Sequence, residues 1–299
     1  MTRTWRSAVW DAGRLPLVGT LVSGAYRRYF DAASARHTRL FHGVFADFAA
    51  AEAAIPAGRN SGYDNSASAG RVIGEWLDVY PSDYPVLLWL SKLVPDCKLL
   101  FDWGGNVGLK YFAFRRYLTY PESFTWLVND VPAVVELGRA TAKREAATAR
   151  AEAANARGET ATAQHEATPE LRFTSTLEEL PAADVLLAAG ALHFIDDPFG
   201  KLASLPGLPA HLIFSKVPAH DAPSVWTLHN MGTAMCPYRL FNRDELVRAV
   251  EDLGYRLIDE WRMPDVFCEI PFFPKYKIEA YSGFYFARNA LPAGEGTQR

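Results

Sequence analysis

The fold of this chain is decided by Lys98-Leu-Leu-Phe-Asp-Trp-Gly-Gly-Asn-Val-Gly108. The stretch begins with apolar residues typical of a buried strand, ends in an acid and turns through glycines, and a helical pattern follows at 109–118. A strand, a glycine loop and a helix in this order are how an open α/β sheet presents backbone N–H groups to a nucleotide-like ligand. Glycine lets the backbone approach a ligand closely, and Asn106 is the non-glycine residue type that best tolerates a positive φ.

The spacing of these glycines does not fit the common dinucleotide and phosphate-loop patterns. The GxGxxG fingerprint fails from Gly104, where an asparagine and a leucine stand at the other two positions, and from Gly105, where a valine and a lysine do. No GxxxxGK[ST] sequence occurs in the chain. The pattern that remains is acid-x-Gly-x-x-x-Gly, formed by Asp102, Gly104 and Gly108.

At these residues the chain resembles the class I S-adenosylmethionine (SAM) methyltransferases, whose first motif is commonly Asp-x-Gly-x-Gly-x-Gly. Asn106 replaces the middle glycine. The chain is similar in particular to a bacterial methyltransferase family associated with surface-polysaccharide gene clusters. The segments that carry this resemblance are Gly-Tyr-Asp at 62–64, the stretch 101–108 and Ala-Gly-Ala-Leu-His-Phe at 189–194. The resemblance implies a Rossmann-like α/β fold with a seven-stranded sheet, SAM as cofactor and methyl transfer to a small molecule, most simply to a hydroxyl of a sugar or an aromatic metabolite.

The resemblance also implies which residues hold the cofactor. An acid that closes the second strand of such folds accepts hydrogen bonds from the ribose hydroxyls, and Asp130 stands at that position. Capping of the next helix is the alternative role for this acid. The expected cofactor-binding residues are Asp102, Gly104, Gly105, Asn106, Gly108, Asp130, Val131, Ser175, Gly190 and Tyr63.

One histidine is a candidate general base. His193 comes a few residues after the expected fourth strand, where the small-molecule O-methyltransferases that the chain resembles often carry a base histidine followed by Asp-Trp. The match is partial, because the sequence here is His-Phe-Ile-Asp-Asp at 193–197. A free imidazole titrates near pH 6.5 and can accept a hydroxyl proton at neutral pH. The apolar neighbours of His193 equally suit a neutral, packed side chain.

Upstream of the glycine stretch, the sequence predicts a helical arm and cap over residues 1–97. Helices are expected at 41–54, 67–80 and 85–93. In the family that the chain resembles, such helices cover the cofactor, so Tyr63, Asp64 and Tyr84 are candidate lid residues. Ordinary packing is an equally good interpretation of all three.

The expected methyltransferase domain spans 98–290 and precedes a tail at 291–299. Its seven strands are expected at 99–101, 124–129, 171–174, 184–189, 211–217, 256–261 and 282–287. A helix capped by Asn242 and stopped by Gly254 lies among them. Low-complexity residues at 145–169 indicate a surface insert without chemistry, and 224–240 reads as a long connection.

The composition indicates an ordinary globular protein. The chain has 299 residues, 49% of them hydrophobic and 22% charged, and a net charge of −3, which argues against nucleic acid as the main partner. Three isolated cysteines suggest a reducing cytoplasm, and the dispersed histidines indicate no metal site. Asp11 and Arg14 interrupt any signal-peptide core. The basic first 40 residues either contact an anionic membrane weakly or form an arm that packs on its own domain.

Two other functions remain open from the sequence. A nicotinamide-dependent oxidoreductase or sugar epimerase is disfavoured by the failed GxGxxG pattern and by the lack of any Tyr-x-x-x-Lys pair. A methyltransferase fold that binds a partner without turnover is kept open by Asn106 in the motif, and by Thr174-Ser175 where an acid often contacts adenine.

Overall fold

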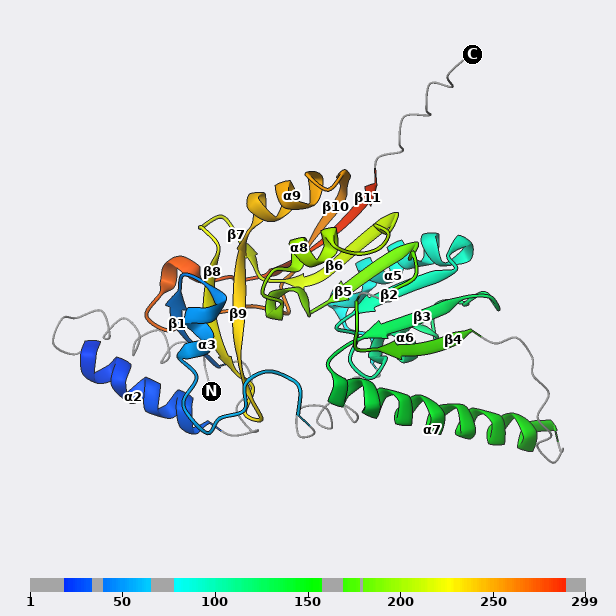
Figure 1. Cartoon of the computed structure of the whole chain (residues 1–299), viewed down its shortest axis with the longest axis horizontal. Coiled ribbons are helices and arrows are strands. Elements are labelled where there is room, and N and C mark those ends of the chain that lie inside the picture. Colours follow the sequence, from blue (N-terminus) through cyan, green and yellow to red (C-terminus); the bar gives the residue numbers. More distant parts are fainter. Residues whose placement is uncertain (1–18, 34–39, 66–77, 158–168, 178–179, 289–299) are drawn as a thin grey trace, which may run out of the picture.

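A seven-stranded sheet forms the centre of the computed structural model, which describes residues 19–33, 40–65, 78–157, 169–177 and 180–288 (Figure 1). The strand order is β10-β11-β6-β5-β2-β3-β4. The strands are β2 (Leu99–Trp103), β3 (Thr125–Asn129), β4 (Glu170–Thr174), β5 (Val185–Ala189), β6 (His211–Val217), β10 (Tyr255–Met263) and β11 (Tyr281–Arg288). The first five are parallel, and β11 is antiparallel to both of its neighbours. The Rossmann-like fold is confirmed, with every expected strand found within two residues at either end.

Helices cover both faces of this sheet, which is why its central strands are apolar throughout. All five residues of β2 are buried, as are four of the five in β5. One face packs against α5 (Tyr84–Leu93), α6 (Leu109–Phe114) and the start of α7 (Pro132–Arg157). The other packs against α8 (Pro198–Ala203) and α9 (Arg243–Glu251). Strands buried on both sides need apolar residues at every position, so they lack the alternation of a half-exposed strand.

The helix α9 follows its sequence signals closely. The side chain of Asn242 accepts a hydrogen bond from the backbone of Glu245, as an N-cap does, and Gly254 ends the helix region with φ of 88°. Leu246, Val247 and Val250 form its buried face. The helix at 109–118 is shorter than expected, because α6 ends at Phe114.

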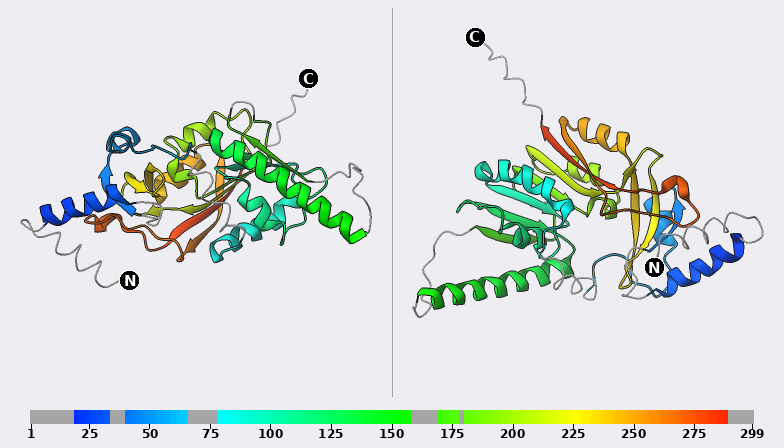
Figure 2. Two further views of the ribbon diagram at one scale, coloured as in Figure 1. Left: turned by 90° about the horizontal axis from the view of Figure 1, so that it is seen from below. Right: turned by 180° about the vertical axis from the view of Figure 1, so that it is seen from behind.

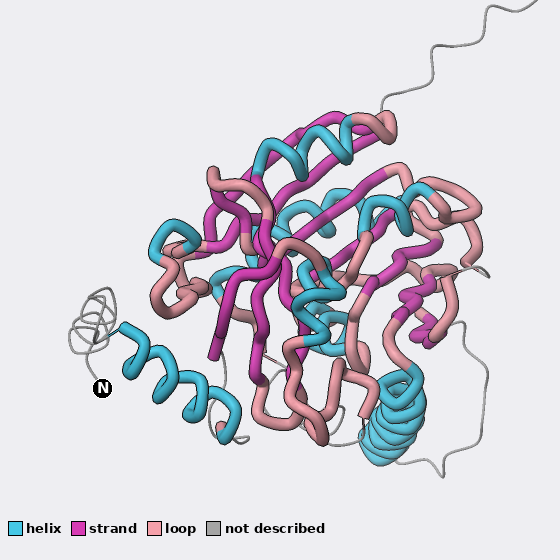
Figure 3. The backbone as a smooth tube through the Cα atoms, turned by 60° about the vertical axis from the view of Figure 1, so that its left-hand side comes forward, coloured by secondary structure: helices cyan, strands magenta, loops and turns pink. Residues whose placement is uncertain are grey.

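A second, four-stranded sheet lies beside the carboxyl end of the first and has the order β1-β8-β9-β7 (Figure 1). It consists of β1 (Leu40–Phe45), β7 (Ala219–His220), β8 (Val225–Asn230) and β9 (Met235–Asn242). The helices α2 (Gly19–Ala32) and α3 (Phe48–Ala53) accompany it. In Figure 3 the helix nearest the N label, α2, lies on the outside of the molecule.

Two predictions fail in this second sheet. The expected helix 41–54 begins as a strand, because β1 pairs antiparallel with β8, and only Phe48–Ala53 is helical. The expected connection 224–240 is an antiparallel hairpin of β8 and β9, closed by a turn in which Met231 N donates to Ala234 O. In both places long-range pairing overrides a local helical or irregular pattern. The N-terminal region is therefore a mixed α/β segment in the part that is described.

Short 3₁₀ helices position several loops: η1 (Pro81–Asp83), η2 (Val94–Asp96), η3 (Leu192–Phe194) and η4 (Pro274–Tyr276).

The expected helix 67–80 falls mostly outside the described residues, as do the basic residues 1–18, the second half of the insert at 158–168 and the tail. The first half of the insert is the long end of α7, which extends away from the sheets in both views of Figure 2. Within the described residues, no helix is long and apolar enough to cross a membrane.

Candidate functional site

The loop after β2 alternates between left-handed and ordinary backbone. Gly104, Asn106 and Gly108 have φ of 71°, 56° and 85°. The expected tolerance of Asn106 for positive φ is confirmed, and its own side-chain oxygen accepts from Val107 N at 2.8 Å. Gly108 stands immediately before α6, so the loop leads directly into the amino end of that helix. The loop lies where the strand order reverses between β2 and β5, which is where open α/β sheets bind ligands.

The two adjacent glycines are required by close packing within the protein. A Cβ on Gly104 would overlap the Cβ of Ala191 in the loop after β5. A Cβ on Gly105 would overlap the carboxylate of Asp102. Gly104 N also donates to Asn129 O at 2.7 Å, which ties the loop to the end of β3. The glycine pair therefore lets the ends of β2, β3 and β5 meet.

Asp102 lies beneath this loop and is 1% exposed. Its carboxylate accepts a hydrogen bond from Trp126 Nε1 at 2.9 Å. Burial raises the pKa of Asp102 to about 7, against the opposing effects of Trp126 and the Lys110 charge. The structure thus gives this predicted cofactor residue a supporting position under the loop, and its carboxylate is not on the accessible side.

Asp130, at the end of β3, joins two loops through its carboxylate. Oδ2 accepts from Asn106 N at 2.9 Å, and Oδ1 accepts from Val131 N at 2.8 Å. Burial raises the pKa of Asp130 to about 6, although both backbone hydrogen bonds favour the charged form. The alternative role as cap of α7 is taken by another acid, since Ala133 N donates to Asp64 Oδ1 at 3.0 Å. Val131 packs with Val107 and Val134 and supports the same corner.

The segment 60–65 connects the second sheet with α7. Gly62 N donates to Met235 O at 3.0 Å at the start of β9, while Asp64 holds the first turn of α7. Between them, the Tyr63 ring makes an edge contact with Phe194, with ring centroids 5.1 Å apart. The segment therefore runs beside the end of β3 and the loop after β5, and the lid role of Tyr63 and Asp64 stays a prediction. Tyr84 is 55% exposed and its ring lies near Tyr117.

The loop after β5 carries Gly190 and His193. Gly190 has φ of 89°, and its N–H donates to Ser215 O at 2.9 Å. His193 is 4% exposed, and its ring lies 4.2 Å from that of Tyr238 on β9. Burial, with a smaller effect of His229, lowers the pKa of His193 well below its usual value, so the imidazole is neutral at pH 7. Within the described part of the chain, His193 Nδ1 has no hydrogen-bond partner.

Ser175 follows β4, the edge strand beside β3. It is exposed directly after that strand, and the neighbouring Asn129 side chain donates to Thr174 O at 3.2 Å. The parallel register Asn129↔Thr174 places Ser175 beside Asp130 at the carboxyl edge of the sheet. The loops after β2, β3, β4 and β5 thus lie at one edge of the sheet, and these loops carry the predicted site residues.

A buried ionic cluster near the same edge is absent from the sequence predictions. Lys110 Nζ lies 2.7 Å from both oxygens of Asp83, and Lys216 Nζ lies 3.6 Å from Asp83 Oδ1. Burial, together with the Lys110 charge, lowers the pKa of Lys216 to about 8. One sequence signal could have identified this cluster: Lys216 is a charged residue at the end of the apolar strand 211–215.

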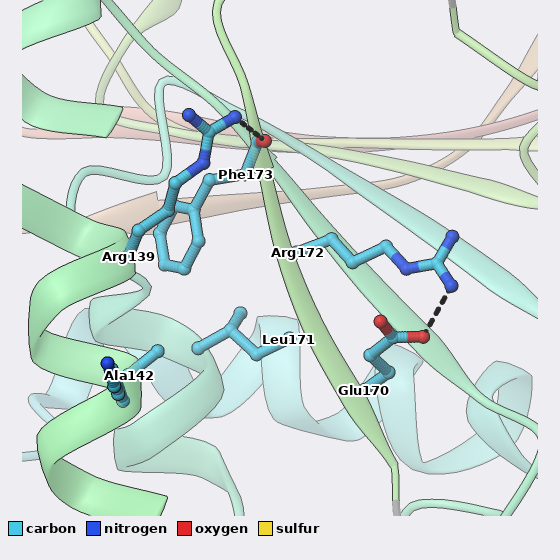
Figure 4. A pocket seen from close by; sticks show the side chains of 7 residues that line it. Arg139, Ala142, Glu170, Leu171, Arg172 and Phe173 are labelled. Atoms are coloured by element: carbon cyan, nitrogen blue, oxygen red, sulfur yellow. Dashed lines mark hydrogen bonds and ion pairs between the residues drawn. The ribbon is translucent and has the colours of Figure 1, made fainter. Parts of the chain in front are cut away.

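A separate groove of about 500 Å³ lies between α7 and the edge strand β4 (Figure 4). Its lining consists of Arg139, Ala142, Lys143, Glu170, Leu171, Arg172 and Phe173. Two of its cations are engaged, since Arg139 donates to Phe173 O at 2.8 Å and Arg172 pairs with Glu170 at 2.6 Å. None of the predicted site residues lines it. Among the described residues there is also no cluster of three or more potential metal ligands.

No protein-family model matches the sequence, and no curated protein matches it. Among solved structures, the chain is similar to 1,6-didemethyltoxoflavin-N1-methyltransferase from Burkholderia thailandensis, at 18% identity over 70% of this chain and 79% of that one, with a TM-score of 0.42. Magnesium protoporphyrin IX methyltransferase from Synechocystis PCC 6803 matches at 14% identity, 69% and 81% coverage and a TM-score of 0.42. The CcbJ methyltransferase from Streptomyces caelestis matches at 12% identity, 71% and 91% coverage and 0.41. These matches are distant, and the fold assignment rests on the strand order described above.

Proposed function

We propose that this protein is a SAM-dependent methyltransferase that acts on a small-molecule acceptor. The observation that carries the proposal is the hydrogen bond between Asn106 N and Asp130 Oδ2, which joins the glycine loop after β2 to the acid after β3. A nucleoside needs both elements at one edge of the sheet: a glycine-rich loop whose backbone it can approach closely, and a carboxylate that accepts hydrogen bonds from the ribose. Each Asp130 oxygen accepts one backbone N–H and keeps further acceptor capacity for a ribose hydroxyl.

The residues around this corner fit SAM. Bound there, the cofactor would supply the activated methyl group of its sulfonium centre, and the protein would contribute orientation and exclusion of water. Asp130 holds the ribose, the backbone of 104–108 supports the nucleoside, and Ser175 stands on the adenine side. Gly190 and Tyr63 border the opposite side, next to the loop that carries His193. Asp102 stabilises the loop from below.

The acceptor lies, in this proposal, on the side of β5 and the second sheet. A hydroxyl acceptor needs its proton removed, and His193 is the base that we propose for this step. Its neutral imidazole is in the form that accepts a proton. Because His193 is buried among Phe194 and Tyr238, access to it requires that the acceptor displace part of this aromatic packing. A sugar or an aromatic metabolite is the acceptor class that we favour, which agrees with the resemblance to a family associated with surface-polysaccharide genes.

The predicted cytoplasmic location remains part of this proposal. Its support is that Cys97, Cys236 and Cys268 are all free and buried, and burial raises the pKa of Cys97 and Cys236 to about 12. Such thiols stay protonated and unreactive, and free cysteines are typical of a reducing compartment. The division into an N-terminal cap at 1–97 and a catalytic domain at 98–290 also stays a prediction.

Isothermal calorimetry with the purified full-length chain tests the function. Titration with S-adenosylhomocysteine (SAH) should give a saturable heat, and titration with NAD should give none. Heat with NAD alone would identify a nicotinamide-dependent enzyme instead. Binding of neither nucleotide would contradict both enzyme classes and favour a methyltransferase-like fold that only binds a partner.

A further inference from the structure

Lys216 has an unusual backbone conformation at the carboxyl end of β6. Its φ is 57°, and among the described residues only Asn106 and Phe272 share a positive φ without being glycine. A non-glycine residue in a left-handed conformation is strained, because its Cβ crowds the following carbonyl oxygen. Such conformations persist where the surrounding structure fixes them, and they concentrate at functional sites.

The conformation belongs to a β-bulge that redirects the side chain. Ser282 pairs with Val217 and Phe284 pairs with Phe214, so two residues of β6 oppose the single Gly283 of β11. Without the bulge, Lys216 would share a face with Leu212 and Phe214, but Val217 takes that place in the core. A bulge of this kind re-aims one side chain beside a site without disturbing the rest of the sheet.

The redirected side chain runs along the edge of the sheet toward α5. Its Cδ lies 3.8 Å from where a Cβ on Gly190 would be, and Nζ lies 3.6 Å from Asp83 Oδ1, just before α5. The Tyr80 ring is also close, with its centroid 5.8 Å from Nζ. The side chain is 16% exposed, so a small opening connects it to solvent. The Lys216 side chain thus starts at β6, passes the predicted site residue Gly190 and ends near Asp83.

The ammonium of Lys216 is poorly satisfied by the protein. Lys110 already occupies both oxygens of Asp83 at 2.7 Å, which balances that carboxylate. At 3.6 Å, Lys216 Nζ lies beyond hydrogen-bond distance from Asp83 Oδ1, and Asp265 is the other acid whose charge acts on it. Both ammoniums therefore face the Asp83 carboxylate, but only Lys110 is in direct hydrogen-bond contact with it, and Lys216 can take a closer acceptor. A mostly buried ammonium in this state carries a desolvation cost that an incoming anion would offset.

We propose that Lys216 binds a carboxylate of a ligand seated over the ends of β5 and β6. The inference rests on the proposed function, which offers two sources of that group: the methionyl end of the cofactor, and an acidic acceptor. Both would place a planar anion next to Gly190 within reach of Nζ. A role limited to supporting Asp83 is disfavoured, because Lys110 alone satisfies both oxygens of that residue.

The first arm of the test separates the two sources. SAH carries the amino-acid carboxylate, whereas 5′-methylthioadenosine keeps the nucleoside and lacks it. Calorimetry with both compounds is run on the wild type, on Lys216→Met, which keeps a linear apolar stem, and on Lys216→Gln. Lys201→Met is the matched control, because Lys201 is an exposed lysine on α8. If the cofactor provides the carboxylate, Lys216→Met and Lys216→Gln weaken SAH at least about tenfold and leave 5′-methylthioadenosine and the control unchanged.

The second arm tests an acidic acceptor. Thermal shift is measured with benzoate and with its neutral counterpart benzamide, at constant ionic strength, on the free and the SAH-saturated protein. Stabilisation by benzoate alone that disappears in Lys216→Met, together with unchanged SAH affinity, assigns the carboxylate to the acceptor. If Lys216→Met behaves as the wild type in both arms, the proposal is wrong. A wild type that does not bind SAH contradicts the proposed function separately, and the benzoate arm on the free protein still decides the role of Lys216.

Discussion

The ends of β2 and β3 differ from the ends of β5 and β6 in how their polar groups are satisfied. After β2 and β3, the acids Asp102 and Asp130 accept hydrogen bonds from an indole and from two backbone amides. After β5 and β6, His193 Nδ1 has no hydrogen-bond partner among the described residues, and the Lys216 ammonium comes no closer than 3.6 Å to Asp83 Oδ1. The first region is organised by the protein itself, whereas the second leaves buried donors and acceptors for something else to complete. Under the proposed function, the first region would be a preformed nucleoside site, and the second would be completed by the ligand that binds there.

The largest effect should come from the ion pair that supports the second region. Asp83→Asn removes the carboxylate nearest to the largely buried Lys110 and Lys216 ammoniums, so the free energy of unfolding should fall by about 3–5 kcal/mol. Urea denaturation measures this loss. Asp31→Asn is the control, because its pair with Arg27 is about one-third exposed and should contribute below about 1 kcal/mol. Equal losses in the two variants would mean that the Asp83 cluster is solvated.

The contact between the two regions gives the next effect. Gly104→Ala should lower the unfolding free energy by roughly 1–3 kcal/mol, because its new Cβ overlaps that of Ala191 and the backbone is left-handed. Adding Ala191→Gly removes the overlap and should restore part of the loss. Chemical denaturation of the single and double variants gives the coupling between them. If the changes in unfolding free energy of the two single variants simply add in the double variant, the loops after β2 and β5 are not in steric contact at these residues.

The pH dependence of Asp102 should show that the first region favours a protonated acid. The pKa of Asp102 rises from 3.8 to about 7 on folding, so the folded state keeps a proton that the unfolded chain loses between these values. Its contribution to stability is therefore complete below pH 3.8 and is lost as the pH rises through 7. Asp102→Asn should gain stability relative to the wild type across that window in denaturation at several pH values. A constant difference between the two proteins would contradict a shifted Asp102.

His193 should show the opposite dependence. Its pKa falls well below 6.5 on folding, so the unfolded chain binds a proton that the folded protein does not, and stability decreases as the pH falls below 6.5. His193→Gln should show less of this acid loss than the wild type. In a methyl-transfer assay with an identified acceptor, the same variant should reduce kcat on the order of 10²-fold while SAH affinity is kept. Retained kcat would leave His193 with a packing role only.

The fold was predictable where the signals are local. The apolar runs at 184–189 and 211–217 and the glycine loop give β5, β6 and the site edge directly, since each is encoded within a few consecutive residues. The second sheet was missed because β1 pairs with β8 across most of the chain, as in Phe41↔His229, and no local pattern encodes that partner. The sequence nevertheless contained a hairpin signal, a glycine at position 232 between two runs rich in β-forming residues. In the structure Gly232 has a φ of 84°.

The site was predictable in its backbone more than in its side chains. Positive φ at Gly104, Asn106 and Gly108 follows from residue type, and the left-handed backbone of these three is confirmed. The direction of the Asp102 side chain was not predictable, because it depends on Trp126 from the neighbouring strand. Lys216 was missed for a similar reason: its placement results from a bulge set by pairing with β11.

SAH calorimetry on Asp130→Ala tests whether Asp130 and the glycine loop form a nucleoside site. The matched control is Asp47→Ala, which removes the capping acid of α3, where Asp47 Oδ1 accepts from Ala50 N. Asp130→Ala should weaken SAH binding by roughly 1–3 kcal/mol through loss of charged hydrogen bonds. Asp47→Ala should lower stability by about 1 kcal/mol and leave the affinity intact. A folded Asp130→Ala protein that binds SAH as tightly as the wild type would show that Asp130 takes no part in nucleoside binding.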